Sequence, residues 1–167
     1  MTESTGAGTV GRVAPAEFRA AMARFAAGVV IVTTREEDGT PRGFTASSFC
    51  SVSQDPPLVL VCLSMAAESH EAFLGCTEFA VSVLRAEQRP LAGLFATRGA
   101  DKFAAGGFGL SPGGLPVAAG ALVELECAVR DRHPAGDHTI LVAEVRGVRL
   151  EEGSPMVYYG RAFHGLA

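Results

Sequence analysis

Hydrophobic positions near the start of the chain predict one helix followed by a buried strand. Phe18, Met22 and Phe25 recur at helical spacing. Pro15 stands in the first turn, where a helix tolerates a residue without an N–H. The β-branched run over 29–34 that follows is typical of a buried strand, so the helix is expected to end before it.

Short strands and helices are predicted to alternate through the middle of the chain. The Asp38-Gly39 pair is a common hairpin turn, and it leads into a strand that begins near Arg42. The apolar runs that follow predict two further strands, over 58–63 and 79–84, and two short helices, over 69–74 and 86–96.

The last third of the chain has the clearest alternation of apolar and polar residues. From 121 to 129 the odd positions are all apolar, so this strand is expected to bury one face. The next strand keeps its apolar residues in the odd phase up to Val145 and in the even phase from Val148. One extra residue would reconcile the two phases, which predicts a β-bulge near Gly147.

Five to seven short strands with two or three helices predict a mainly β fold. The strands follow one another mostly through short turns, unlike the regular βαβ alternation of a doubly wound sheet. A closed or partly closed antiparallel barrel fits this order, with glycines and bulges supplying the curvature. The uncharged stretch over 104–120, with six glycines and two prolines, is expected to be a long loop.

Length and composition indicate one globular domain. A chain of 167 residues, of which 48% are hydrophobic, has the apolar side chains for one core and too few charges for disorder. We expect a flexible tail over 1–13 and a single domain over 14–167. A GxGxxG match over 6–11 lacks the preceding strand that a dinucleotide fingerprint requires, so it is interpreted as accidental.

Charge, hydropathy and cysteine spacing exclude several classes of protein. The formal net charge of -4 argues against nucleic acid as a partner. The longest apolar run, over 56–63, is far shorter than the about 20 residues that a membrane helix needs. The four cysteines have neither CxxC nor zinc-ligand spacing, and no apolar leader precedes them. We therefore expect reduced thiols in a cytoplasmic protein.

Hydroxyl side chains cluster at the predicted second strand. Thr45, Ser47 and Ser48 fall within four residues, and Ser51 and Ser53 follow closely. Hydroxyls and neighbouring backbone N–H groups can hold a phosphate without full charges. The alternative is a polar strand edge whose hydroxyls bond to their own backbone.

Two further candidates stand alone in the sequence. Lys102 is the only lysine, and with Phe103 it could contact a phosphate and a flat ring; an exposed salt bridge is the alternative. His138 follows Asp137 at the start of a predicted strand, where it could bond to a ligand or complete an ordinary turn. Neither a catalytic triad nor a metal-ligand spacing is present, so we expect a cofactor to supply the chemistry.

Several segments in order resemble the flavin reductase-like, FMN-binding split-barrel family. The nearest subgroup is the small NAD(P)H:flavin oxidoreductases that serve two-component monooxygenases. The motifs TASSF, SVSQDPPLVLVC, DKF and GDHTI carry the resemblance. They lie within the segments 18–34, 38–63, 79–96, 100–106 and 134–145.

The resemblance implies a six-stranded antiparallel Greek-key split β-barrel with peripheral helices. It also implies a homodimer with the flavin bound near the dimer interface. The implied activity is hydride transfer from NADH or NADPH to FMN or FAD, with the reduced flavin passing to a partner monooxygenase. His138 is implied to place the nicotinamide. The residues implied to bind the flavin are Thr45, Ala46, Ser47, Ser48, Cys50, Ser51, Ser82, Val83, Leu84, Lys102 and Phe103.

Two alternatives remain beside the reductase. One is a flavin-binding electron carrier that another protein reduces, and the other is a barrel that has lost its ligand and serves as a dimeric interaction domain. Relatives often carry asparagine where this chain has Ser82, which weakens that flavin contact. The chain has no clear arginine cluster for a 2′-phosphate, which favours NADH slightly over NADPH. The choice between FMN and FAD stays open.

Overall fold

The computed structural model describes residues 11–166. Of the predicted tail only residues 11–13 are described, so the boundary at residue 13 stays a prediction, and the GxGxxG match lies almost wholly outside the described part. None of the helices in this part is long and apolar enough to span a membrane.

The helices are α1 (Pro15–Met22), α2 (His70–Gly75), α3 (Arg89–Ala96) and the 3₁₀ turn η1 (Ala86–Gln88). The strands are β1 (Ala27–Gly28), β2 (Val30–Arg35), β3 (Pro41–Ala46), β4 (Phe49–Gln54), β5 (Pro57–Ser64), β6 (Glu78–Val83), β7 (Phe108–Leu110), β8 (Pro116–Ala118), β9 (Val123–Ala135), β10 (His138–Leu150), β11 (Met156–Tyr159) and β12 (Ala162–Gly165).

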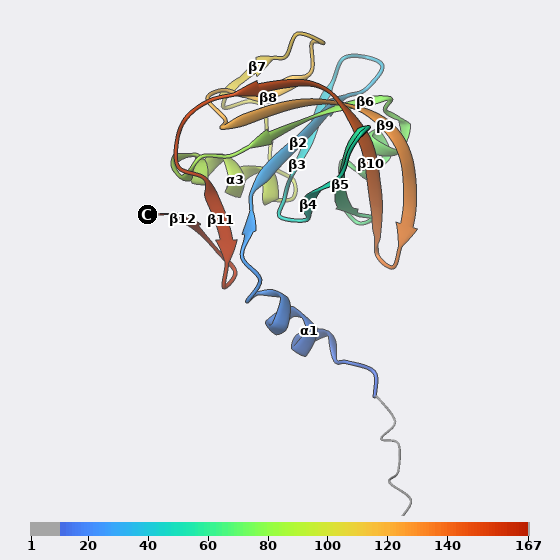
Figure 1. Ribbon diagram of the computed structural model, residues 1–167, viewed down its shortest axis with the longest axis vertical. Helices are drawn as coiled ribbons and strands as arrows, with labels where there is room; N and C mark the ends of the chain where they lie inside the picture. The colour runs from blue at the N-terminus through green and yellow to red at the C-terminus, as the bar shows by residue number, and fades with distance from the viewer. Residues whose placement is uncertain (1–10, 167) are drawn as a thin grey trace, which may run out of the picture.

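One antiparallel sheet in the order β3-β2-β6-β9-β10-β5-β4 dominates the molecule. Its edge strands, β3 and β4, are consecutive in the sequence, and only Ser47-Ser48 separates them. The sheet is strongly curved, so that its two ends come together around the core (Figure 1). The predicted mainly β, antiparallel fold is therefore confirmed. The sheet has seven strands where the resemblance implied six.

Turn chemistry and bulges shape this sheet as the sequence predicts. Gly39 has a φ of +87° in the β2–β3 turn, which favours glycine, and the Thr40 N–H donates to Asp38 Oδ1 at 2.8 Å. The register of β9 and β10 shifts between Val145 and Gly147, which confirms the predicted bulge. A second shift, after Val142, has no counterpart in the prediction because it leaves the phase of the neighbouring apolar residues unchanged.

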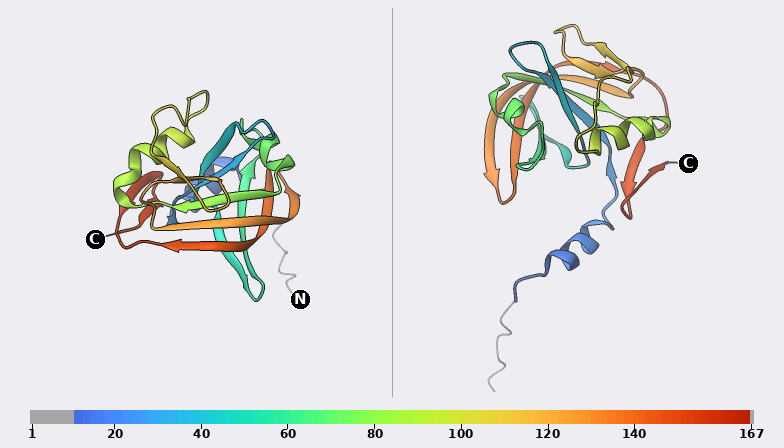
Figure 2. Two further views of the ribbon diagram at one scale, coloured as in Figure 1. Left: turned by 90° about the horizontal axis from the view of Figure 1, so that it is seen from above. Right: turned by 180° about the vertical axis from the view of Figure 1, so that it is seen from behind.

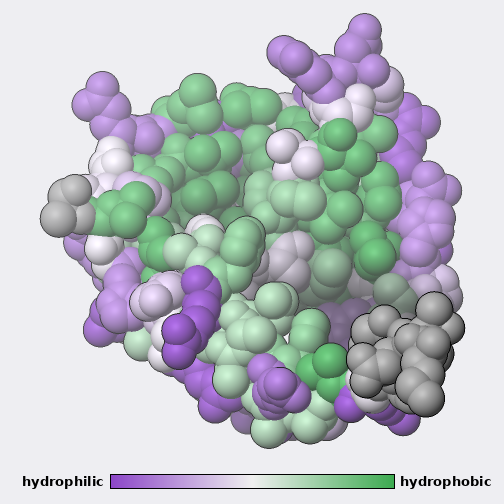
Figure 3. Space-filling view, turned by 60° about the horizontal axis from the view of Figure 1, so that its bottom comes forward, coloured by the Kyte–Doolittle hydropathy of each residue, from purple (hydrophilic) through white to green (hydrophobic). Residues whose placement is uncertain are grey.

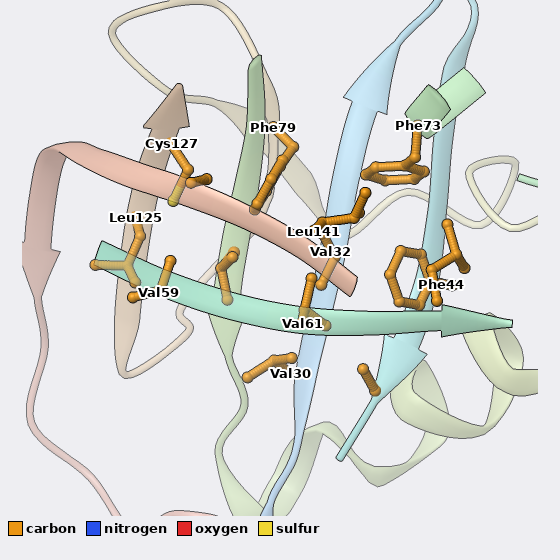
Figure 4. Packing of buried hydrophobic residues seen from close by; sticks show 14 residues of the cluster. Val30, Val32, Phe44, Val59, Val61, Phe73, Phe79, Leu125, Cys127 and Leu141 are labelled. Atoms are coloured by element: carbon orange, nitrogen blue, oxygen red, sulfur yellow. The ribbon is translucent and has the colours of Figure 1, made fainter. Parts of the chain in front are cut away.

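The main core lies inside the curved sheet (Figure 4). Val59, Val61 and Leu63 alternate inward along β5 while their neighbours are half-buried or exposed, as one buried face requires. Helix α2 adds Phe73, whose ring meets Phe44 edge-on at a centroid distance of 5.1 Å. Burial of these side chains holds α2 against one end of the sheet.

A second apolar cluster fixes α3 against the outer side of β2 and β3. Phe95 and Ala92 of α3 are buried beside Ile31 of β2. Gly43 of β3 has no room for a side chain, since a Cβ there would lie 2.9 Å from Phe95 Cε1. The Thr45 hydroxyl donates to the Ala92 carbonyl at 2.7 Å. The C-terminal end of α3 is thereby held close to β3, seen from behind in Figure 2.

The expected long loop over 104–120 is wrong in part. This stretch contains the β7–β8 hairpin, and Leu115, Val117 and Ala118 are buried. The Ala118 N–H donates to the buried Ser82 hydroxyl at 3.0 Å. Local composition suggested an irregular loop, but burial of three apolar side chains against the sheet orders the hairpin.

Two apolar surfaces of the described chain remain uncovered. The predicted first helix is confirmed as α1, but it ends at Met22 and projects from the body (Figure 1). Phe18, Met22 and Phe25 are 58%, 53% and 72% exposed. Val148, whose phase placed it on a buried face, is also exposed within this chain.

Candidate functional site

A cleft of about 530 Å³ opens between the curved sheet and the end of α3. This volume lies within the range of about 300–1,000 Å³ that small-molecule sites occupy. Segments far apart in the sequence line it, from β3, β5, α3, the loop after α3 and the start of β10. The lining residues are Phe44, Thr45, Ala46, Ser47, Ser48, Cys62, Leu63, Ser64, Ala66, Ala67, Glu68, Phe95, Ala96, Thr97, Arg98, Lys102 and His138.

The predicted hydroxyl cluster forms the wall of this cleft nearest β3. Thr45 and Ser48 both line the cleft and both bond to the backbone. The Ser48 hydroxyl donates to the Cys62 carbonyl at 3.0 Å and accepts from the Cys62 N–H at 3.2 Å. Ala46 is buried, whereas Ser47 is exposed at the cleft. The structure thus brings these four residues together.

Lys102 reaches the same cleft from the loop after α3. Its ammonium donates to the Gly43 carbonyl at 3.2 Å, which leaves further N–H groups for a ligand. Burial lowers the pKa of Lys102, and the nearby Glu68 carboxylate opposes this shift. A half-buried ammonium with a neutral partner is suited to pairing with an incoming phosphate.

His138 lines the cleft from the first residue of β10. Its Nδ1 lies 2.6 Å from Asp137 Oδ1, and this contact lowers the pKa of Asp137. The histidine side chain is 42% exposed, so Nε2 is available to a ligand. His138 of β10 is the register partner of Ser64 of β5, and this pairing fixes the position of His138 along the cleft.

The other predicted site residues lie outside this cleft. Cys50 and Ser51 are exposed on β4, beyond the cleft lining. Ser82 is fully buried, where its hydroxyl accepts the Ala118 N–H. The neighbours Val83 and Leu84 pack into the two apolar clusters. Their proposed contacts with flavin stay predictions.

Phe103 lies beside a second pocket of about 330 Å³, which we call the side pocket. Its ring packs against Phe95 and Phe108 at centroid distances of 5.1 and 4.9 Å. The side pocket and the main cleft share two lining residues, Glu68 and Lys102. Phe103 therefore stands next to the main cleft without lining it.

Sequence reasoning missed two charged residues of the cleft, Glu68 and Arg98. Both Glu68 carboxylate oxygens accept the Gly99 N–H, at 3.0 and 3.1 Å. Arg98 Nε lies 3.9 Å from Glu68 Oε1, and its side chain is 75% exposed. The sequence offered only a positional signal for these two residues. Glu68 directly follows the uncharged residues 56–67, and Arg98 shortly precedes the DKF motif.

The residues present fit a phosphorylated flavin. Ala66, Ala67 and Ala96 offer an apolar surface to a flat ring, the strand residues offer polar groups to its edge, and Lys102 offers one cation to a phosphate. Among the residues over 11–166, no group of three or more His, Cys, Asp or Glu is arranged to hold a metal ion. Among the residues that line the cleft, no nucleophile is hydrogen-bonded to a base.

Comparison with known proteins identifies the family. Residues 22–167 match the flavin reductase like domain. The chain is 53% identical over 150 residues to the actinorhodin polyketide dimerase of Streptomyces coelicolor, covering 89% of this chain and 85% of that protein. It is 41% identical to the NADH:riboflavin 5′-phosphate oxidoreductase of Streptomyces pristinaespiralis, covering 91% and 88%.

A solved structure with a similar fold carries both ligand types in its name. It is the NADH:FAD oxidoreductase SgcE6 of Streptomyces globisporus, in complex with NAD and FAD fragments. The TM-score is 0.86 and the identity 38%, with coverage of 91% of this chain and 92% of that one. The resemblance inferred from the sequence motifs is confirmed, and this chain belongs to the flavin reductase like domain family.

Proposed function

We propose that the protein is an NADH-dependent flavin reductase that supplies reduced flavin to a partner monooxygenase. One observation carries the proposal: Thr45, Lys102 and His138, from three distant segments, line a single cleft of ligand size. Relatives named as NADH-dependent flavin reductases support it, among them those of Streptomyces pristinaespiralis and a Rhodococcus species. A relative named as the reductase subunit of a flavin-dependent monooxygenase supports the partner.

The chain's own residues bind and orient the ligands in this proposal. When bound, the flavin would accept a hydride from the nicotinamide. Residues 45–48 would hold one edge of the ring, Lys102 would hold the phosphate, and Ala66 and Ala96 would line the apolar side of the ring. His138 positions the nicotinamide through Nε2 while Asp137 orients its ring. Positioning two rings face to face is the main requirement for this transfer, so no strong acid or base is needed.

The direct test is anaerobic mixing of the purified protein with FMN and NADH. Loss of the oxidised flavin absorbance should be accelerated over the protein-free mixture, and NADPH should act more slowly. A preparation that retains flavin through gel filtration, yet is not reduced by either nucleotide, would instead identify an electron carrier. If the protein binds neither FMN nor FAD, the remaining interpretation is a dimeric interaction domain that has lost its ligand.

We also propose that the protein acts as a homodimer. The exposed apolar face of α1 supports this, as does a groove of about 630 Å³ on the barrel. Apolar side chains of β4, β5, β9 and β10, including Val52 and Val148, line much of this groove. Figure 3 shows broad hydrophobic surface on the face of the molecule that it turns forward. A second copy would cover both surfaces, because each copy supplies the same pair of patches.

Oligomeric state tests this second proposal. The wild type should elute as a dimer in gel filtration with light scattering, and Phe18→Asp should shift it toward the monomer. Glu17→Gln, at an exposed position on the same helix, is the matched control and should leave the dimer intact. A monomeric wild type at micromolar concentration would contradict the dimer.

A cytoplasmic location is proposed as well, supported by four free cysteines.

A further inference from the structure

The loop that leads from α3 to Lys102 is joined to the rest of the fold by one side chain. Residues 98–101 of this loop are mostly exposed. Within the part of the chain that the structure describes, each hydrogen bond or ion pair from 98–101 to a distant segment ends on Glu68. Its two carboxylate oxygens accept the Gly99 N–H at 3.0 and 3.1 Å, and Arg98 Nε lies 3.9 Å from Oε1. We call the bond between Glu68 and Gly99 the tether.

Glu68 itself belongs to a short segment, between β5 and α2, that is fixed on both sides of it. Before Glu68, the Met65 N–H donates to the Asp137 carbonyl at 2.9 Å. After it, His70 Nε2 lies 3.0 Å from the Thr139 hydroxyl, and both of these residues are buried. Both contacts are made to the start of β10. The tether therefore joins an exposed loop to a well-held part of the cleft wall.

Glu68 acts on Lys102 in two separate ways. Through the tether it restrains the backbone three residues before Lys102, and it uses none of the N–H groups of the ammonium. One of these groups donates to the Gly43 carbonyl at 3.2 Å, so the others stay available to a ligand. Through its charge Glu68 opposes the lowering of the Lys102 pKa by burial. Because Glu68 and Lys102 line the same cleft, that negative charge would also repel an incoming phosphate.

We propose that Glu68 is a positioning residue whose bond to the Gly99 N–H holds the Lys102 ammonium in place for the flavin phosphate. This proposal rests on the proposed function, which places that phosphate at Lys102. Because the Glu68 charge alone would repel the phosphate, removal of the side chain should weaken FMN binding only if the tether outweighs the charge. The direction of the change in affinity therefore separates the two effects.

Two substitutions test the proposal by titration of FMN into the purified protein freed of flavin. Glu68→Ala removes tether and charge together and should weaken FMN binding by about threefold, less than the roughly tenfold expected when Lys102 itself is lost. Glu68→Gln removes the charge but keeps an oxygen that can accept the Gly99 N–H, so it should bind FMN at least as tightly as the wild type. Glu152→Ala removes an exposed carboxylate outside both cavities and is the control, with no expected change in affinity.

Riboflavin and a double variant show whether the effect passes through the phosphate and Lys102. Glu68→Ala should leave the affinity for riboflavin unchanged, because riboflavin has no phosphate. In a Lys102→Met background, Glu68→Ala should cause no further loss of FMN affinity, since no ammonium remains to be positioned. Amide hydrogen exchange over 97–103, measured without flavin, should be faster in Glu68→Ala than in the wild type and should be restored by Glu68→Gln.

Several results would overturn the proposal. Unchanged or tighter FMN binding by Glu68→Ala would mean that Glu68 acts through its charge alone. Equal losses in Glu68→Ala and Glu68→Gln would exclude the tether, as would unchanged hydrogen exchange in Glu68→Ala. Equal losses for FMN and riboflavin, or a further loss in the Lys102→Met background, would show an effect on the shape of the cleft. Absence of flavin reduction by NADH would instead contradict the proposed function, since these affinities are measured without turnover.

Discussion

Replacing Lys102 by methionine tests whether this residue holds the flavin phosphate. The variant keeps most of the apolar stem and removes the charge. A hydrogen bond to a charged group contributes about 1.5–3 kcal/mol. Because the ammonium is only partly buried and keeps the Gly43 carbonyl as a partner, the lower end applies, about 1.5 kcal/mol. This corresponds to roughly tenfold weaker FMN binding.

Riboflavin, which lacks the phosphate, supplies the control for this variant. Titration by quenching of flavin fluorescence should give a tenfold loss for FMN and no change for riboflavin. Burial lowers the pKa of Lys102, so the folded state disfavours its charged form, and removal of the charge should not lower the melting temperature. Equal losses for FMN and riboflavin would refute the phosphate contact, because the variant would then act through the shape of the cleft.

Three further predictions concern the donor, the core and the thiols. His138→Ala should raise the KM for NADH more than the Kd for FMN, measured by steady-state kinetics and titration; the opposite order would remove His138 from the donor site. Phe79→Ala should lower the unfolding free energy by about 3–5 kcal/mol in urea, since this side chain is fully buried, and a loss below about 1 kcal/mol would contradict the packing. Burial raises the pKa of Cys127 to about 12, so at pH 9 its thiol stays protonated and iodoacetamide should label the exposed Cys50 first; equal labelling in the native protein, resolved by mass spectrometry, would contradict this burial.

Periodic apolar residues made most of the fold predictable. The turn at Asp38-Gly39 and the change of phase near Gly147 each reflect a local constraint, and each appears in the structure. The alternation over 121–129 appears only in part, because β9 begins at Val123 and Glu124, at an even position, is buried. The β7–β8 hairpin was not predictable in the same way. Leu115 and Val117 are buried because the hairpin packs on the sheet, which is a long-range contact that local composition does not record.

The sequence predicted the site residues whose motifs border the cleft. It did not predict which motif residues are buried away from the cleft. Thr45, Lys102 and His138 come from motifs that the fold brings to one cavity. Ser82 carries the same hydroxyl, yet its strand is paired on both sides and its side chain faces inward. Glu68 escaped notice because its role depends on the Gly99 N–H, which lies 31 positions away in the sequence.

The alternative interpretation of the hydroxyl cluster, in which the hydroxyls bond to their own backbone, is wrong for Thr45 and Ser48. Their hydroxyls bond to the backbone of distant elements, α3 and β5. The same bonds fasten β3 to the elements that form the opposite walls of the cleft. A ligand therefore meets a wall whose geometry is fixed before binding, which lowers the ordering cost of association. It follows that a substitution at Thr45 is expected to change the distance between β3 and α3 as well as the surface that the ligand meets.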